Sequence, residues 1–428
     1  MAKLISRRGA IIGGIATFTG GLILLNRPKD NSGPRAPYFL RLQDALVNAG
    51  IATPTLVIDL ERLNANVDTL MASLPDGMGY RIVAKSLPSL ELISHIRKRA
   101  GTQRLMTFNL PMLQQISRDM PDTDQLLGKP LPAAAAKSYF EELPTQAAQA
   151  ATNVQWLIDT PRRLAQYIDV GNAFGASLRV NIELDIGLHR GGFTPGPELQ
   201  SVLQTIRDHD HLSFAGFMGY DPHIASLPTT LGWRDRALHG GWALYGEAKE
   251  QARVVFGDAA MDGLVLNAAG SPTYRLYDNT NIANEISVGS ALVKPTDFDT
   301  ELLEPFVAAA FIATPVIKTM GDTRMPGIEF ADKPLRVWDE NLDNTVFIYG
   351  GHWLASPVDP PGLQYNAIFG RSSNQEMLNG GAQLQIAPDD FVFLRPHQSE
   401  ALFMQFGDIA VYDDGAIIDR WPVFPASA

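Results

Sequence analysis

A lysine directly after a short apolar run is the residue of this 428-residue chain best suited to covalent chemistry. The run 81–84 ends at Ala84, and Lys85 and Ser86 follow it. At the carboxyl end of a barrel strand such an amine would lie where barrel enzymes keep their active sites, and it could attack an aldehyde. Taken alone, Lys85 could equally be a solvated loop lysine.

A turn of small residues at 270–274 could bind a phosphate. Its sequence is Gly-Ser-Pro-Thr-Tyr. Backbone amides in such a turn can approach a phosphate dianion closely, and the hydroxyls of Ser271 and Thr273 add donors. The alternative is an ordinary surface turn.

Two further polar side chains follow candidate strands, and each has a structural alternative. Arg190 could line a ligand pocket, or it could pair with Glu183 or Asp185. Tyr220 could lie beside a ligand or be an aromatic residue of a barrel core. The residue types alone do not decide between these interpretations.

The elements that would position these residues alternate between strand and helix. Apolar runs predict strands at 55–59, 81–84, 104–107, 154–158, 178–183, 214–219, 263–266 and 285–288. Amphipathic segments at 60–74, 87–99, 161–174 and 198–208 lie between several of them. Eight strands alternating with helices predict an α/β fold with a (β/α)8 TIM-type barrel over 51–295. A doubly wound sheet is the alternative, but no G-x-G-x-x-G follows the first strand.

After Lys294-Pro295 the alternation of apolar runs with helical segments stops, and we expect a mostly antiparallel β domain over 296–428. Short apolar runs separated by turn residues predict strands at 307–317, 335–337, 346–349, 390–394, 408–412 and 416–422. Asp413-Asp414-Gly415 is a good hairpin turn before the last of them.

Residues 1–30 have the order of an export signal. A basic stretch with Ser6-Arg7-Arg8 precedes an uncharged run from Gly9 to Leu25 and resembles a twin-arginine signal. The alternative is a membrane anchor. We therefore expect a protein that is periplasmic, or anchored and facing the periplasm, with the twin-arginine export machinery as a partner. Residues 31–50 are expected to form a linker and an N-terminal helix.

Composition excludes several classes of function. The net charge of −11 argues against nucleic acid as a partner, because phosphate backbones require a basic surface. The chain contains no cysteine, which excludes disulfides, thiolate nucleophiles, Fe–S clusters and cysteine-ligated zinc.

An ordered set of motifs resembles the D-serine dehydratase and D-threonine aldolase family, which belongs to the alanine-racemase-type (fold-type III) pyridoxal-phosphate (PLP) enzymes. The resemblance covers about residues 50–425. The motifs are Thr-Pro-Thr-Leu-Val-Ile-Asp at 53–59 with Asn-Ala-Asn at 64–66, Asn-Ile-Glu-Leu-Asp-Ile-Gly-Leu-His-Arg-Gly-Gly at 181–192, Gly-Tyr-Asp at 219–221, the turn 270–274, Asn-Glu-Ile-Ser-Val-Gly-Ser at 284–290, and Asp-Arg-Trp-Pro-Val at 419–423.

The resemblance implies PLP as the cofactor and assigns residues to it. Lys85, at the end of the second barrel strand, is implied to hold the cofactor as a Schiff base. The turn at 270–274 is implied to grip the phosphate, with Arg190 and Tyr220 beside the ring. The implied cofactor-binding set is Lys85, Arg190, Tyr220, Gly270, Ser271, Thr273, Tyr274, Gly289 and Ser290.

The sequence departs from this family at the metal site. Family lyases carry a divalent metal such as Zn or Mn, held by a histidine and, two residues later, a cysteine or aspartate. His397 matches the histidine, but Ser399 occupies the second position, and a neutral hydroxyl is a poor metal ligand. Glu400, as the next residue of a strand, is expected to point to the opposite face. The metal, and with it the dehydratase and aldolase activities, is therefore in question.

The resemblance implies a PLP-dependent lyase, a dehydratase or aldolase, that acts on β-hydroxy D-amino acids. One alternative is an amino-acid racemase of the alanine-racemase type, and another is a PLP-binding protein without turnover. Members of the family generally pair barrel against C-terminal domain, so a homodimer is also implied.

Overall fold

The computed structural model describes residues 28–143 and 148–425. Most of the predicted export signal, 1–27, lies outside these residues. Among the described helices, none has the length and apolar character needed to span a bilayer. The described chain divides into two compact units, one of 28–54 with 312–395 and one of 55–311 with 396–425.

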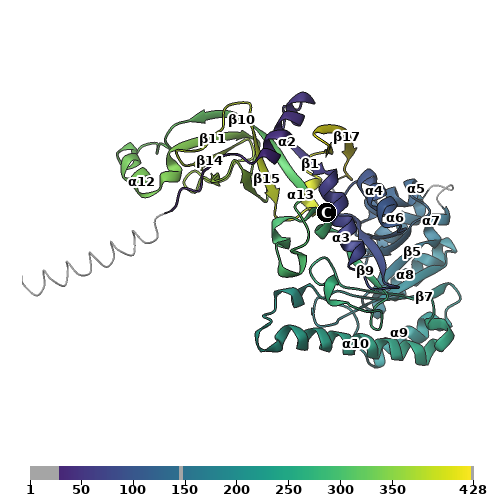
Figure 1. Cartoon of the computed structure of the whole chain (residues 1–428). Helices are drawn as coiled ribbons and strands as arrows, with labels where there is room; N and C mark the ends of the chain where they lie inside the picture. Colours follow the sequence, from purple (N-terminus) through teal and green to yellow (C-terminus); the bar gives the residue numbers. More distant parts are fainter. Residues whose placement is uncertain (1–27, 144–147, 426–428) are drawn as a thin grey trace, which may run out of the picture. The chain divides into compact units, whose positions relative to one another are not determined.

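A closed barrel of eight parallel strands forms the larger unit, which confirms the predicted TIM-type barrel (Figure 1). Closure occurs where the first and last strands pair, with Gly79 opposite Glu285. The strands are β2 (Gly79–Val83), β3 (Arg104–Thr107), β4 (Asp124–Leu127), β5 (Val154–Ile158), β6 (Leu178–Leu184), β7 (Leu212–Gly219), β8 (Val265–Ala268) and β9 (Glu285–Val288).

One strand of the barrel differs from the prediction. The run predicted as its first strand, β1 (Thr55–Asp59), pairs in parallel with β16 (Asp408–Asp413) outside the barrel. The eighth barrel strand is β4, which has polar residues in its first two positions and only two leucines after them. That apolar signal is too short to stand out in the sequence. Lys85 therefore follows the first strand of the barrel, not the second.

Helices connect the barrel strands, and local signals fix their ends. Ser89, Asn109 and Thr160 each accept a hydrogen bond from the backbone at the start of the following helix. Gly101 and Gly175 close two of these helices in the left-handed conformation. The principal helices are α3 (Leu60–Ala72), α4 (Leu90–Ala100), α5 (Leu110–Asp119), α6 (Ala133–Glu142), α8 (Pro161–Phe174), α9 (Pro197–Asp208) and α10 (Trp233–Phe256).

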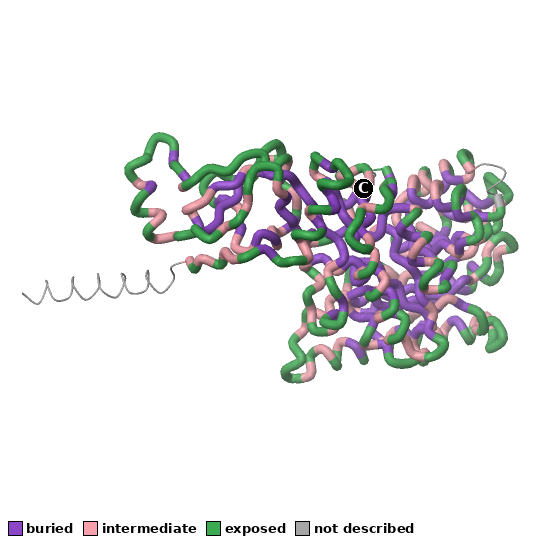
Figure 2. The backbone as a smooth tube through the Cα atoms, turned by 45° about the horizontal axis from the view of Figure 1, so that its top comes forward, coloured by how far each residue is buried: buried purple, intermediate pink, exposed green. Residues whose placement is uncertain are grey.

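Burial follows this arrangement. The barrel strands run as buried segments inside helices whose outer faces are exposed (Figure 2). Leu92, Ile93 and Ile96 show the pattern on α4, because their spacing places all three on the face that packs on the strands. The barrel interior is therefore closed to solvent over most of its length, and its strand ends carry the accessible polar groups.

The smaller unit is mostly antiparallel, as the sequence predicts. β10 (Ala310–Met320) pairs with β11 (Asn344–Tyr349), and β11 pairs with β14 (Gln375–Gly380). β15 (Phe391–Pro396) also runs antiparallel to β10. The predicted strand 335–337 is wrong, because these residues lie in α12 (Asp332–Trp338). An acidic residue in the first turn and Arg336 in the last suit the helix dipole.

The remaining elements are short. α2 (Pro37–Asn48) agrees with the predicted N-terminal helix, and β17 (Ala416–Pro422) forms the predicted hairpin with β16. The other strands and helices are β12 (Ala355–Asp359), β13 (Gln364–Tyr365), α7 (Ala148–Thr152), α11 (Ser290–Val293) and α13 (Glu400–Phe403).

Candidate active site

Lys85 lies at the carboxyl end of β2, in a single 3-10 turn over Ala84–Ser86. Its Nζ is 2.6 Å from Oε1 of Glu400 and 4.9 Å from the centre of the Phe108 ring. The lysine side chain is 37% exposed, so the amine is held by neighbours and still accessible. This placement is the one that chemistry at a barrel mouth requires.

Arg190 and Tyr220 lie against each other after β6 and β7. The guanidinium carbon is 5.1 Å from the centre of the tyrosine ring, and Nη2 is 3.9 Å from Oε1 of Glu183. Burial raises the pKa of Glu183, and Arg190 opposes that rise. Burial also raises the pKa of Tyr220, so the phenol is neutral at ordinary pH. The pairing of Arg190 with Glu183 is therefore observed, together with a contact to Tyr220, and its place beside a ligand stays a prediction.

The turn at 270–274 is held by a buried aspartate that the sequence did not single out as functional. The Thr273 hydroxyl donates to Asp221 at 2.6 Å and accepts from the backbone N–H of Gly270. The Tyr277 hydroxyl donates to the other carboxylate oxygen at 2.7 Å. Burial raises the pKa of Asp221 above its ordinary value. The sequence offered one signal for Asp221, because it directly follows Tyr220, a predicted site residue.

Two positions at this turn and beside it have no room for a side chain larger than that of glycine. A Cβ on Gly270 would lie 2.6 Å from a ring carbon of Tyr220, and one on Gly289 would lie 2.8 Å from the carbonyl oxygen of Val83. The turn and the end of β9 are joined through Ser271, whose hydroxyl oxygen accepts from the backbone N–H groups of Gly289 and Ala291. Two glycines and a serine thus bring three strand ends close together.

Ser290 and Tyr274, the other two predicted site residues, make different contacts. The hydroxyl of Ser290 is 3.0 Å from that of Ser86, beside Lys85. The hydroxyl of Tyr274 lies 3.1 Å from that of Ser73, the residue after α3. Ser290 therefore contacts the residue that follows Lys85 in the chain, while Tyr274 makes its hydrogen bond to the end of α3.

The predicted metal position does not fit a metal. Among the described residues, no group of three or more His, Asp or Glu side chains is arranged to hold an ion. Ser399 is fully buried, and its hydroxyl has no hydrogen-bond partner in the described part of the chain. A buried serine hydroxyl two residues from an imidazole is a poor donor set for Zn or Mn.

Glu400 is the clearest correction to the sequence prediction. It was expected to continue a strand and point away from the site. Instead β15 ends at Pro396, and Glu400 begins the short helix α13. The alternation of a strand therefore does not apply to it, and its carboxylate reaches Lys85.

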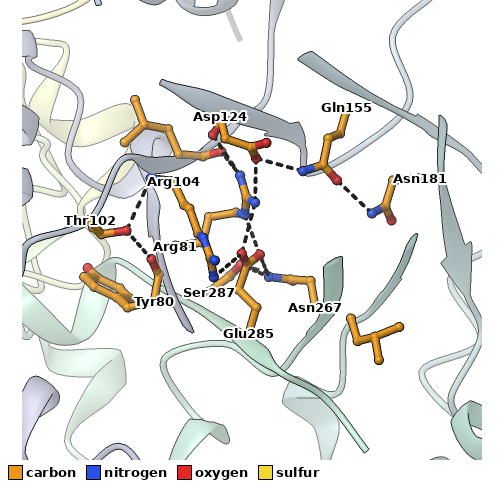
Figure 3. A network of polar contacts seen from close by, with 12 residues as sticks. Tyr80, Arg81, Thr102, Arg104, Asp124, Gln155, Asn181, Asn267, Glu285 and Ser287 are labelled. Carbon is orange, nitrogen blue, oxygen red and sulfur yellow. Dashed lines mark hydrogen bonds and ion pairs between the residues drawn. The ribbon is translucent and has the colours of Figure 1, made fainter. Parts of the chain in front are cut away.

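Below the mouth, the barrel interior holds a network of buried charges that the sequence analysis also missed (Figure 3). Arg81 is fully buried and donates to Glu285 at 2.5 Å and to Asp124 at 2.7 Å. Asn267 donates to Glu285 and Gln155 to Asp124, each at 2.7 Å. The sequence carried one signal for this burial. Side chains alternate between the two faces of a strand, so Arg81 lies on the same face of β2 as the apolar Val83.

The Asp124 carboxylate of this network is stabilised in its charged form. Burial raises the pKa of Asp124, but Arg81 and Arg179 outweigh it and leave the pKa below its ordinary value. The guanidinium of Arg81 keeps a raised pKa despite its burial, because Glu285 and Asp124 face it. Such a paired interior network supports the barrel and offers no group for exchange.

Comparison with known proteins agrees with this architecture. Residues 58–297 match the family model described as alanine racemase, N-terminal domain, which covers more than half of the chain. A 3-hydroxy-D-aspartate aldolase of Paracoccus denitrificans (strain Pd 1222) is 20% identical over 283 residues, 64% of this chain and 68% of that protein.

Two solved structures share the fold over nearly their whole length. D-threonine aldolase from Filomicrobium marinum has a TM-score of 0.71 at 18% identity, and the match covers 87% of this chain and 95% of that one. D-threo-3-hydroxyaspartate dehydratase from Delftia sp. HT23 has a TM-score of 0.68 at 17% identity, over 88% and 98%. At these identities the similarity shows the fold.

Proposed function

The chain belongs to the alanine racemase N-terminal domain family, and on that premise we propose that it is a PLP-dependent lyase of β-hydroxy D-amino acids. The observation that carries the proposal is the placement of Lys85 at the barrel mouth, accessible and beside an acidic and an aromatic residue. The named relatives support the substrate class, because each is an enzyme of a D-amino acid with a hydroxyl group on the β-carbon.

The residues at the mouth suit a phosphate-bearing aromatic cofactor. The turn from Gly270 to Thr273 offers small residues and hydroxyls to a phosphate. Tyr220, neutral at ordinary pH, and Arg190 provide a flat ring and a cation beside it. When bound, PLP supplies an electron sink that makes the substrate α-proton removable.

The roles of this chain's residues follow from their positions. Lys85 binds the cofactor and, once released by a substrate amine, is placed to accept the α-proton. Asp221 positions the phosphate turn through Thr273. Arg190 and Tyr220 border the ring. The sequence leaves racemisation and binding without turnover as alternatives, and the experiment below separates them.

The test is a spectrum followed by a substrate panel. Purified protein loaded with PLP should show a visible absorption band that Lys85→Ala abolishes and Lys137→Ala retains, since Lys137 lies exposed on α6. D-serine, D-threonine and 3-hydroxy-D-aspartate should yield a keto acid and ammonia by dehydration, or glycine and an aldehyde by aldol cleavage. Racemised D-alanine with intact β-hydroxy substrates would indicate a racemase. A colourless protein indifferent to PLP would contradict the whole proposal.

Two further expectations from the sequence are proposals. We propose export through the twin-arginine pathway, which a reporter fused to residues 1–30 tests, because replacing Arg7 and Arg8 together by lysine should retain the fusion in the cytoplasm. We also propose a homodimer, which light scattering on the purified protein tests directly.

A further inference from the structure

The amine of Lys85 is paired with a carboxylate that no family pattern in the sequence assigns. Oε1 of Glu400 lies 2.6 Å from Nζ, and the two side chains are 37% and 38% exposed. Both residues belong to the same compact unit. The pair is therefore close enough for direct proton transfer and open enough for a substrate to reach both groups.

Glu400 also stands beside the other polar groups of the mouth. Burial is the main cause of the raised pKa of Tyr220, but the negative charge of Glu400 adds to it. The carboxylate therefore contacts Lys85 and lies near enough to Tyr220 for its charge to act on the phenol.

The described residues near Glu400 do not form a donor set for a metal ion that could act on the substrate β-hydroxyl. Ser399, directly before Glu400, is buried and its hydroxyl makes no hydrogen bond among the described residues. No described cluster around His397 is suited to an ion. The β-hydroxyl group of a substrate therefore needs a proton donor or acceptor from the protein itself.

We propose that Glu400 is a catalytic acid–base residue that carries the proton of the substrate β-hydroxyl, so that the lyase reaction proceeds without a divalent metal. This inference rests on the proposed function. It adds a residue, and a metal-independent route, to the lysine chemistry common to the family.

The proton balance closes for dehydration. Lys85 takes the proton from the α-carbon and passes it across the 2.6 Å contact to Glu400. Glu400 delivers it to the β-oxygen as the Cβ–O bond breaks, and the electron pair leaves with the oxygen as water. The Cα–H electrons form the Cα–Cβ double bond. Both side chains return to their starting state, and no oxidant or reductant is consumed.

Aldol cleavage uses the same pair in the opposite direction. Glu400 accepts the hydroxyl proton as the Cα–Cβ bond breaks and an aldehyde forms. Glu400 passes that proton to Lys85 across their contact, and Lys85 delivers it to the α-carbon, so both side chains return to their starting state. Either product pattern agrees with the proposal, because in both cases Glu400 handles the proton on oxygen.

The kinetic test separates the proton on carbon from the proton on oxygen. In D2O, D-alanine offers an α-proton and no β-hydroxyl, so its exchange followed by NMR reports on Lys85. Glu400→Gln should lower kcat for β-hydroxy substrates by about 10²–10⁴-fold and retain D-alanine exchange within a few-fold. The matched control is Glu198→Gln, an exposed acid in the first turn of α9, which should change neither.

Metal content provides a readout independent of activity. Active holoenzyme should contain far less than one divalent ion per chain by elemental analysis, and dialysis against a chelator should leave kcat unchanged. Full activity in Glu400→Gln, or activity lost to chelator and restored by Zn²⁺ or Mn²⁺, would overturn the inference. Absence of both a cofactor band and D-alanine exchange in the wild type would instead remove the proposed function on which it rests.

The contact itself can be tested chemically. A carbodiimide should join Lys85 to Glu400 as an amide in the full-length protein without cofactor, and peptide mass spectrometry should identify the link. The link should disappear in Glu400→Gln and when PLP, fixed by borohydride, occupies Lys85. Lys137 and Glu141, 3.4 Å apart on the surface of α6, are the positive control. A linked control pair without a Lys85–Glu400 product would contradict the inference.

Discussion

Arg81 in β2 and Lys85 just after it each form an ion pair with a glutamate. The two pairs have nearly the same N–O distance, but one is buried and the other is partly exposed. Arg81 and Glu285 are 2.5 Å apart and fully buried in the barrel interior. Lys85 and Glu400 are 2.6 Å apart and more than one third exposed at the mouth. Distance alone therefore does not distinguish a structural pair from a functional one. The two pairs differ in how many further hydrogen bonds their charged groups make.

The interior pair belongs to a network with many partners. Glu285 also accepts from Asn267, and Arg81 also donates to Asp124 and to two backbone carbonyls. At the mouth the contacts are fewer and solvent reaches both members. We conclude that the interior charges hold strands together, while the mouth charges remain available to a ligand.

The largest effect is expected from breaking the interior pair. Arg81→Met should lower the free energy of unfolding by about 3–5 kcal/mol, because buried Glu285 is left with Arg104 as its cation, and that side chain is 46% exposed. Thermal or urea unfolding followed by circular dichroism measures the loss. The matched control is Arg99→Met on the surface of α4, where the lost partner Asp68 is exposed and the stability should stay unchanged.

A stable Arg81→Met protein would overturn the comparison. It would mean that the interior network contributes as little as a surface pair. Lys85→Ala should keep its melting temperature close to that of the wild type without cofactor, because its partner remains solvated. A large loss of stability in Lys85→Ala would contradict the functional interpretation of the mouth pair.

A medium effect is expected from filling space at the mouth. Gly270→Ala places a methyl group 2.6 Å from the Tyr220 ring and should cost about 1–3 kcal/mol of stability. It should also weaken PLP binding, measured by titration of the visible band, because the ring and the phosphate turn move apart. Gly240→Ala, at an exposed position of α10, meets no atom within 4 Å and should stabilise slightly. Unchanged PLP affinity in Gly270→Ala would show that Tyr220 is not a wall of the site.

Acid should affect the two ends of the barrel with opposite sign. The pKa of Asp221 is raised in the fold by burial, so the folded protein takes up its proton first as the pH falls towards 3.8. Its contribution to stability therefore grows as the pH falls. The pKa of Asp124 is lowered in the fold, so its contribution is complete above about 3.8 and is lost only below that value.

Paired melting curves measure this difference between pH 7 and pH 3. The wild type should gain stability relative to Asp221→Asn as the pH falls towards 3.8, seen as a growing difference in Tm. Its advantage over Asp124→Asn should stay constant to about pH 4 and shrink below it. The same sign for both variants would contradict the assigned environments.

The sequence predicted the parts of the fold that carry local signals. The motifs around Lys85 and the turn 270–274 have fixed spacing, and eight alternating strands predict a barrel. The prediction failed where only three-dimensional pairing decides. β1 has the apolar pattern of a barrel strand but pairs with β16, and β4 has almost no apolar pattern but lies in the barrel between β3 and β5.

Glu400 shows why part of the site could not be predicted. The direction of the Glu400 side chain depends on where β15 ends. β15 ends at Pro396 and α13 begins at Glu400, and the local sequence does not fix this boundary. The buried network was hidden for a related reason. Arg81 and Glu285 are 204 residues apart in the chain, and nothing in either local sequence names the other.

The smallest effect on stability is expected at Arg190, which sharpens the comparison from the side of the mouth. Its side chain is 55% exposed, so Arg190→Met should change the free energy of unfolding by less than about 0.5 kcal/mol. Its contacts with Tyr220 and Glu183 nevertheless face the proposed ring position, and loss of the cation should weaken PLP binding by about tenfold. Arg207→Met, an exposed arginine at the end of α9, should change neither quantity. Equal PLP affinity in Arg190→Met and the wild type would reduce Arg190 to a surface residue, and the functional mouth would then contract to Lys85, Glu400 and the phosphate turn.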